Sequence, residues 1–136
     1  MTEKSWDHSV DVLIVGSGNG ALTAALSSYE MGVKDLLIVE KSAEIGGTSA
    51  TSGGGVWIPG NRYAKAAGAQ DSFDDAKAYL LNTTPEGAVP EEMVDSYLRN
   101  GPKMIDFLHE RSDVRYETLE HYPDYYTNVA GSRTGH

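Results

Sequence analysis

Three small residues and one acid stand in this sequence where a bound dinucleotide would need them. Gly16 and Gly18 follow a short apolar run, Val12–Val15, and Ala21 takes the third place of a G-x-G-x-x-G/A pattern. Gly16 permits a tight turn, Gly18 lets the backbone approach a pyrophosphate, and Ala21 is small enough for helix to pack on strand. The N–H groups at the start of that helix favour an anion. The pattern predicts a phosphate-binding turn made of Gly16, Ser17, Gly18, Asn19 and Gly20.

The acid is Glu40, which ends a second apolar run about 20 residues after the turn. Its carboxylate can accept hydrogen bonds from both hydroxyls of a ribose, and it would repel the 2′-phosphate of NADP. The residues between the two apolar runs are rich in Ala and Leu and predict a helix over 21–31. We therefore expect a strand–helix–strand unit over 11–41, with strands at 12–15 and 36–39. The first strand should be buried on both faces, as in a parallel sheet. A glycine turn without a ligand is the alternative.

A second stretch, residues 42–61, is rich in Gly, Ser and Thr and ends in the apolar cluster Val56-Trp57-Ile58-Pro59. Flexible Gly/Ser linkers rarely end in this way. A backbone with so few side chains can lie flat against a large planar group and offer it N–H and hydroxyl donors. This stretch is predicted to complete the cofactor site, with a plain surface loop as the alternative.

Composition removes several classes of function. The chain has 136 residues, a formal net charge of −9 and no cysteine, which argues against a nucleic-acid partner and against disulfides and thiolate metal sites. No His or carboxylate spacing indicates a metal site. No apolar run approaches the roughly 20 residues of a membrane span, and the first ten residues lack the apolar core of a signal peptide. We expect a cytoplasmic protein without a membrane span.

The remainder of the chain predicts mostly helices. Ser72 and Asp75 fit a capping box at the start of one helix, and residues 84–90 read as a loop. A second helix should start at Pro90 and run to about residue 111, with Pro102 kinking or splitting it. Residues 114–119 could form a short strand. The expected apolar stripe of the second helix consists of Met93, Tyr97, Gly101, Met104, Ile105 and Leu108.

Several short motifs together resemble one enzyme family. They are Gly16-Ser17-Gly18, Glu40-Lys41, Gly46-Gly47-Thr48-Ser49-Ala50, Ser52-Gly53-Gly54 and Trp57-Ile58-Pro59-Gly60. As a set they are similar to the N-terminal part of FAD-dependent oxidoreductases of the fumarate reductase and succinate dehydrogenase flavoprotein group. Within that group they most resemble the 3-ketosteroid Δ1-dehydrogenases. The resemblance covers about residues 11–135.

The resemblance implies a role for each motif. Residues 16–20 would hold the pyrophosphate of FAD, and Glu40, followed by Lys41, the adenosine ribose. The residues expected to line the ribityl chain and the flavin ring are Gly47, Thr48, Ser49, Ser52, Gly53 and Gly54. Succinate dehydrogenases attach FAD to a histidine near this region. This chain has no histidine there, so FAD is expected to bind non-covalently.

The segment Tyr122-Pro123-Asp124-Tyr125-Tyr126 carries the second part of the resemblance. From physics alone, its tyrosines read as aromatic packing. The 3-ketosteroid Δ1-dehydrogenases have a similar Pro-Asp-Tyr-Tyr segment. Its first tyrosine supports another tyrosine, which acts as the base and is expected to lie beyond His136. That implies a catalytic role for Tyr125. The partners implied are a steroid-like ketone and an electron acceptor, and the reaction implied is 1,2-desaturation.

Two other functions stay open. A fumarate reductase or another enone-reducing flavoprotein would keep FAD and change the substrate, and a non-catalytic remnant would at most bind nucleotide. Fumarate reduction needs arginines that clamp two carboxylates. No obvious pair occurs among Arg62, Arg99, Arg111, Arg115 and Arg133.

The predicted fold is α/β: an incomplete Rossmann-like FAD-binding βαβ unit followed by helices. Residues 1–62 are assigned to the N-terminal part of the FAD-binding domain. Residues 63–136 are assigned to a helical segment and the start of the substrate region. Two strands are too few for a complete doubly wound sheet, so the chain is expected to be a piece of a longer flavoenzyme.

Overall fold

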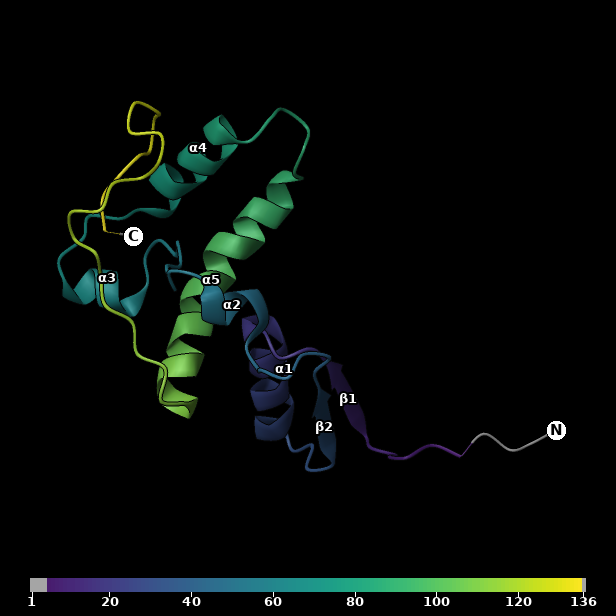
Figure 1. The fold of residues 1–136 in the computed structure, drawn as a ribbon. Helices are drawn as coiled ribbons and strands as arrows, with labels where there is room; N and C mark the ends of the chain where they lie inside the picture. The colour runs from purple at the N-terminus through teal and green to yellow at the C-terminus, as the bar shows by residue number, and fades with distance from the viewer. Residues whose placement is uncertain (1–4, 136) are drawn as a thin grey trace. The chain divides into compact units, whose positions relative to one another are not determined.

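The structure, a computed structural model, describes residues 5–135. These residues form two compact units that divide between Gly55 and Val56 (Figure 1). The first unit holds both strands of the described chain and two helices, and the second holds three helices and an irregular C-terminal segment. Among the described residues, no helix has the length and apolar character needed to cross a membrane.

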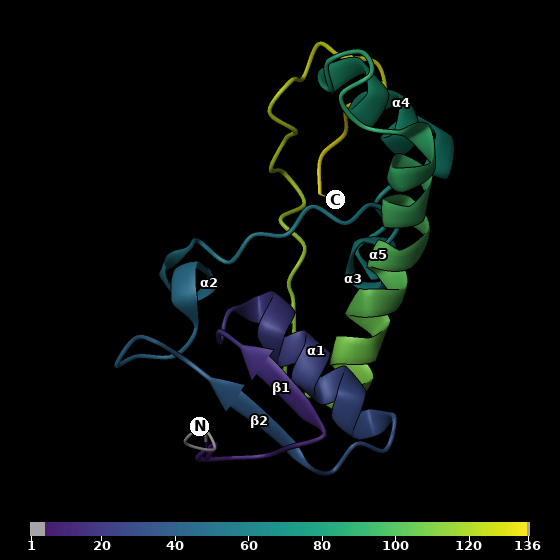
Figure 2. The same cartoon turned by 90° about the vertical axis from the view of Figure 1, so that its right-hand side faces the viewer.

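The first unit is built on a parallel pair of strands. Strand β1, Val12–Val15, lies beside β2, Leu36–Val39, with Val12 opposite Leu36 and Val15 opposite Val39. Helix α1, Asn19–Glu30, connects them and contacts both strands (Figure 2). The predicted βαβ unit is therefore confirmed, with both strands at their predicted bounds. The helix begins two residues earlier than predicted because Gly18 is its N-cap.

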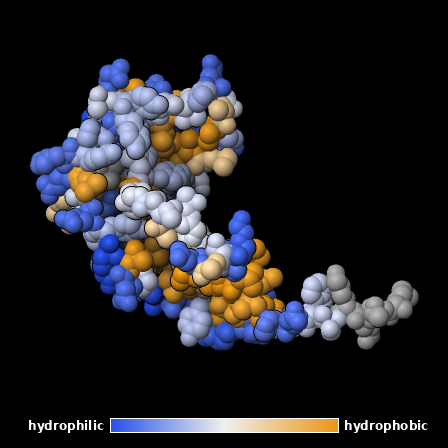
Figure 3. All heavy atoms as spheres, viewed as in Figure 1, coloured by the Kyte–Doolittle hydropathy of each residue, from blue (hydrophilic) through white to orange (hydrophobic). Residues whose placement is uncertain are grey.

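The burial of β1 differs from the prediction. Ile14 is 9% exposed, whereas Leu13 and Val15 are 57% and 78% exposed. Alternate residues of a strand point to opposite faces, and within this unit α1 is the helix that packs on the strands. The expectation of a strand buried on both faces is therefore wrong for this chain. Figure 3 shows the result as an apolar patch over β1.

Short helices follow in the Gly-rich stretch and after it. Helix α2, Gly47–Thr51, lies inside the Gly-rich stretch, for which the sequence predicted no helix. Helix α3, Arg62–Ala66, starts the helical part of the second unit. The side chain of Asn61 caps it by accepting hydrogen bonds from the N–H groups of Tyr63 and Ala64, at 2.8 and 3.1 Å.

The core of the second unit lies between its two longer helices. Helix α4, Phe73–Thr83, packs on α5, Glu91–Arg111. Ser72 caps α4 as predicted, because its Oγ accepts a hydrogen bond from the N–H of Asp75 at 3.0 Å. The loop predicted over residues 84–90 separates the two helices. The buried cluster between them consists of Ala76, Val94 and Leu98, with Trp57, Phe73 and Leu80 packed against it.

Helix α5 decides between two predicted effects of Pro102 and corrects the predicted apolar stripe. The predicted effects were a kink or a split, and the helix runs through Pro102 as one element, so it is not split. Met93 and Tyr97, placed on the apolar stripe, are 60% and 44% exposed. In the first two turns each buried position lies one residue after the predicted one. The observed buried positions are spaced by four, three, four and three residues, which also fits one face of a helix. The buried residues are Val94, Leu98, Gly101, Ile105 and Leu108.

The C-terminal segment after α5 is irregular. The expected strand over 114–119 is absent from the described chain. One isolated antiparallel bridge joins Pro123 to Thr134. Beside it, the N–H of Asp124 donates to the carbonyl of Arg133 at 3.0 Å, and the N–H of Gly135 donates to the carbonyl of Tyr122 at 3.2 Å. These bonds close residues 122–135 into a loop that runs beside α4.

Candidate functional site

The turn after β1 has the geometry that anion binding requires. Gly16 has φ +98°, a conformation that favours glycine, and its N–H donates to the carbonyl of Val39 at 2.7 Å. Gly18 then caps α1 without a side chain. The first helical hydrogen bond joins the N–H of Leu22 to the carbonyl of Gly18, and the N–H groups of Gly20 and Ala21 have no acceptor among the described residues. The first turn of α1 contains no acid of its own that would offset the positive end of the helix.

Glu40 leaves β2 at the same edge of the sheet. Its Oε2 accepts the hydroxyl proton of Ser17 at 2.6 Å, and its Oε1 accepts the N–H of Ser42 at 2.9 Å. The Ser17 hydroxyl is the main cause that lowers the pKa of Glu40 below its ordinary value. The N–H of Ser42 is the second cause and also lowers the pKa. Desolvation comes third and raises the pKa, and the N–H groups of Lys41 and Ser17 lower it by smaller amounts. Glu40 is therefore an oriented, ionised carboxylate at neutral pH.

The start of the Gly-rich stretch contacts the turn. The N–H of Gly46 donates to Ser17 Oγ at 2.9 Å, and the N–H of Asn19 donates to Ser49 Oγ at 3.1 Å. A Cβ added at Gly18 would lie 3.6 Å from Ser49 Oγ, so the two segments approach to ordinary van der Waals contact there. The structure thus brings together the turn at 16–20, Glu40 and residues 46–49.

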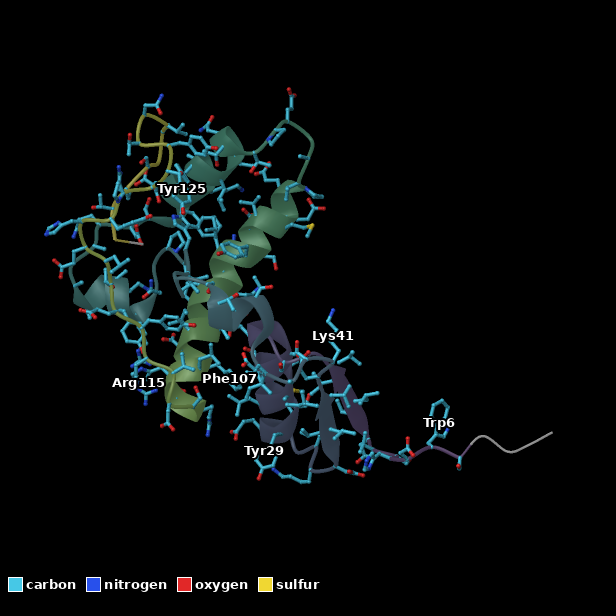
Figure 4. The ribbon with its side chains drawn as sticks, viewed as in Figure 1. Trp6, Tyr29, Lys41, Phe107, Arg115 and Tyr125 are labelled. Carbon is cyan, nitrogen blue, oxygen red and sulfur yellow. The ribbon has the colours of Figure 1, made fainter. Side chains whose placement is uncertain are left out.

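Other predicted site residues of the first unit are exposed and less constrained. Ser52, Gly53 and Gly54 are exposed, and their hydrogen bonds are local: Ser52 Oγ donates to the carbonyl of Ser49 at 2.9 Å and accepts the N–H of Gly54 at 3.1 Å. The carbonyl of Thr48 accepts the hydroxyl of Thr51. Lys41 is exposed and extends from the end of the strands (Figure 4).

Tyr125 belongs to the second unit. Its side chain is 87% exposed, and Figure 4 places it on the C-terminal segment beside α4. The adjacent Tyr126 is anchored through its N–H, which donates to the hydroxyl of Tyr79 on α4 at 3.2 Å. Tyr125 is therefore presented by a fixed backbone with its ring in solvent.

Sequence reasoning missed the importance of Asp124, which is 7% exposed. Its Oδ1 accepts the indole N–H of Trp57 at 2.7 Å, and its Oδ2 accepts the backbone N–H of Arg133 at 2.9 Å. The guanidinium of Arg133 in turn bonds Asp75 of α4 at 2.8 Å. The pairing of a Pro-Asp turn with an indole 67 residues away leaves no signal in a single sequence.

Comparison with known proteins places this geometry in context. A family model described as "FAD binding domain" matches residues 11–135. A 3-oxosteroid 1-dehydrogenase of Mycolicibacterium smegmatis is 39% identical over 123 residues, which are 90% of this chain and 21% of that protein. A 4-oxocyclohexanecarboxylate 2-dehydrogenase of Sinomonas cyclohexanicum is 38% identical over 125 residues, which are 92% of this chain and 21% of that protein.

A solved structure agrees with these relatives. The 3-ketosteroid Δ1-dehydrogenase of Sterolibacterium denitrificans, solved in complex with 1,4-androstadiene-3,17-dione, is similar with a TM-score of 0.84 and 41% identity, over 93% of this chain and 22% of that one. The chain thus spans about a fifth of the length of the relatives it matches. The resemblance to 3-ketosteroid Δ1-dehydrogenases is confirmed, and so are the α/β fold class and FAD as the cofactor of the family. The chain belongs to the FAD binding domain family.

Proposed function

We propose that the first unit of this chain holds the ADP part of FAD, non-covalently, in a dehydrogenase that desaturates a cyclic ketone of the 3-ketosteroid class. The observation that carries this proposal is the meeting of two groups at one sheet edge. These are the N-terminus of α1, with two N–H groups that have no acceptor among the described residues, and the oriented carboxylate of Glu40. A helix N-terminus suits an anion and a carboxylate suits a pair of hydroxyls, and ADP carries both groups.

The capacity of Glu40 supports the ribose contact. A carboxylate has about four lone-pair sites, and its two full hydrogen bonds, from the Ser17 hydroxyl and the Ser42 N–H, use one site on each oxygen. The N–H groups of Lys41 and Ser17 act on it only weakly, which leaves acceptor capacity on both oxygens. Two ribose hydroxyls could donate to the remaining sites without displacing either bond. The ionised state of Glu40 makes these hydrogen bonds stronger than neutral ones.

The Gly-rich stretch would continue the site along the cofactor. Residues 46–49 already contact the phosphate-binding turn, and Ser52, Gly53 and Gly54 keep an exposed backbone that a ribityl chain or flavin ring could cover. The stretch contains Thr48, Ser49 and Ala50 and no histidine, in keeping with non-covalent binding. By this proposal residues 1–62 serve the cofactor and residues 63–136 begin the substrate region.

Tyr125 is the residue of this chain that we assign to substrate chemistry. When bound, FAD would accept a hydride from one carbon of the substrate while a proton leaves the neighbouring carbon next to the ketone, so that a C=C bond forms. The base that takes this proton is a phenolate, and a hydrogen bond donated by a second phenol stabilises its charge before the transfer. The exposed hydroxyl of Tyr125 is available for that bond.

The test uses the protein as its own cell produces it. Anaerobic addition of a 3-ketosteroid should bleach the flavin absorbance. Bleaching by 4-oxocyclohexanecarboxylate instead of the steroid, or reoxidation of reduced flavin by fumarate, would be the competing outcomes. Tyr125→Phe should lower the rate of bleaching about 100-fold, within the range of general acid–base effects, and leave FAD bound. Tyr122→Phe, another exposed tyrosine of the same segment, is the matched control. Equal rates in the two variants would remove the catalytic role of Tyr125, and a protein without flavin would refute the cofactor proposal.

A further inference from the structure

Ser17 occupies the second position of the phosphate-binding turn, yet its side chain is turned into the protein. The residue is 2% exposed. Its hydroxyl donates to Glu40 Oε2 at 2.6 Å and accepts the N–H of Gly46 at 2.9 Å. These partners lie 23 and 29 residues further along the chain. One buried hydroxyl therefore joins the turn, the end of β2 and the start of the Gly-rich stretch.

The hydrogen-bonding capacity of Ser17 argues against its hydroxyl as a direct ligand of the cofactor. A serine hydroxyl has one donor, and here Glu40 receives it. A phosphate accepts hydrogen bonds and would need that same donor. Contact with phosphate through the hydroxyl would leave the 2.6 Å bond to Glu40 broken.

We propose that Ser17 is a positioning residue, whose hydroxyl fixes the carboxylate of Glu40 and the loop starting at Gly46 in one arrangement and thereby couples the ribose contact to the rest of the FAD site. This inference rests on the proposed function. It assigns to Ser17 a role distinct from that of its glycine neighbours, which expose backbone to the cofactor. Loss of the hydroxyl would release two segments at once: Glu40 would lose its shortest hydrogen bond, and Gly46 would lose its acceptor.

The coupling has a signature in the pH dependence of FAD binding. The main causes that shift the pKa of Glu40 are hydrogen bonds and desolvation, and the Ser17 hydroxyl is the largest of them. Removing it should raise the pKa of Glu40. Since the ionised carboxylate is the better acceptor for ribose hydroxyls, FAD affinity declines as pH falls through this pKa. In Ser17→Ala the decline should begin at a higher pH than in the wild type.

The experiment measures the FAD affinity of the protein as its own cell produces it, after removal of bound flavin, between pH 3.5 and 7.5, by quenching of flavin fluorescence. Ser17→Ala should lower FAD affinity about tenfold at pH 7. It should also move the acid limb of the profile, the part in which affinity falls with falling pH, to higher pH. Ser49→Ala is the matched control, because it removes the other side-chain acceptor between the same two segments without touching Glu40. It should lower affinity and leave the position of the acid limb unchanged. In Glu40→Gln the decline of affinity at acid pH should disappear. The double variant with Ser17→Ala should likewise show no such decline.

Two further readouts keep the outcomes separate. Titration of the Glu40 carboxyl by NMR, without FAD, should show a higher pKa in Ser17→Ala than in the wild type. Ser17→Cys preserves the side-chain size with a weaker donor, so it should move the pKa in the same direction even if the alanine variant does not fold. An unchanged Glu40 pKa in Ser17→Cys and an unmoved acid limb would overturn the positioning role. A wild-type chain that shows the Glu40 shift but binds no FAD would refute the proposed function instead.

Discussion

The carboxylate of Asp124 should hold the second unit together far more strongly than an ordinary surface acid. It is buried, and the hydrogen bonds that it accepts include those from the indole of Trp57 and from the backbone of Arg133. A hydrogen bond to a charged group contributes about 1.5–3 kcal/mol, so Asp124→Ala should lower the free energy of unfolding by about 3–5 kcal/mol. Asp124→Asn keeps the shape but offers one carbonyl acceptor, so it should cost about 2 kcal/mol.

The sequence provides a convenient assay for this change. It contains two tryptophans, Trp6 and Trp57, and Trp6 is 78% exposed. In a Trp6→Phe background, urea unfolding followed by tryptophan fluorescence would report on Trp57 and thus on the second unit. Asp113→Asn, which changes an exposed acid of the same unit, should stay within about 0.5 kcal/mol of the parent. An Asp124→Ala variant as stable as this control would refute the reasoning, because the buried carboxylate would then anchor nothing.

Two further changes test other parts of the second unit. Gly131 has φ +86°, and a Cβ there would collide with the carbonyl oxygen of Asp75, so Gly131→Ala should cost about 3 kcal/mol or more by urea unfolding. Gly87→Ala, at φ +74° in open space, has the backbone strain without the clash and should cost about 1–2 kcal/mol; equal effects would show that α4 and the loop do not approach as described. Ser72→Ala should cost about 1 kcal/mol and reduce helicity, because α4 loses its N-cap; an unchanged circular dichroism melting curve would contradict that role.

The first unit was predictable from the sequence because its signals are local. Strand, glycine turn, helix and terminal acid follow one another within a short stretch, and each constrains the next. The turn and Glu40 therefore came out at their predicted positions, as did both strands. Helix α2 was missed since five residues of Gly, Ser, Thr and Ala carry no helical periodicity, and it forms where Gly46 and Ser49 bond to the turn.

The errors in the second unit come from tertiary contacts. Both Met93 and Val94 fit an apolar helix face, and only packing against α4 selects Val94. The segment 114–119 has residues suited to a strand but no neighbouring strand among the described residues to pair with. The partnership of Trp57 with Asp124 depends on two residues that no periodicity relates.

The exposed face of β1 has a thermodynamic consequence. Leu13 and Val15 stay hydrated in the folded chain, so unfolding the first unit exposes little new apolar surface at these positions. The heat capacity of unfolding rises with newly exposed apolar area and averages about 12–15 cal/mol/K per residue in globular proteins. The first unit should fall below that average, and its stability curve should be flatter with temperature than the curve of a unit with a two-sided core. Calorimetry should therefore measure a smaller heat capacity change of unfolding per residue, because one side of the sheet is already exposed to water in the folded chain.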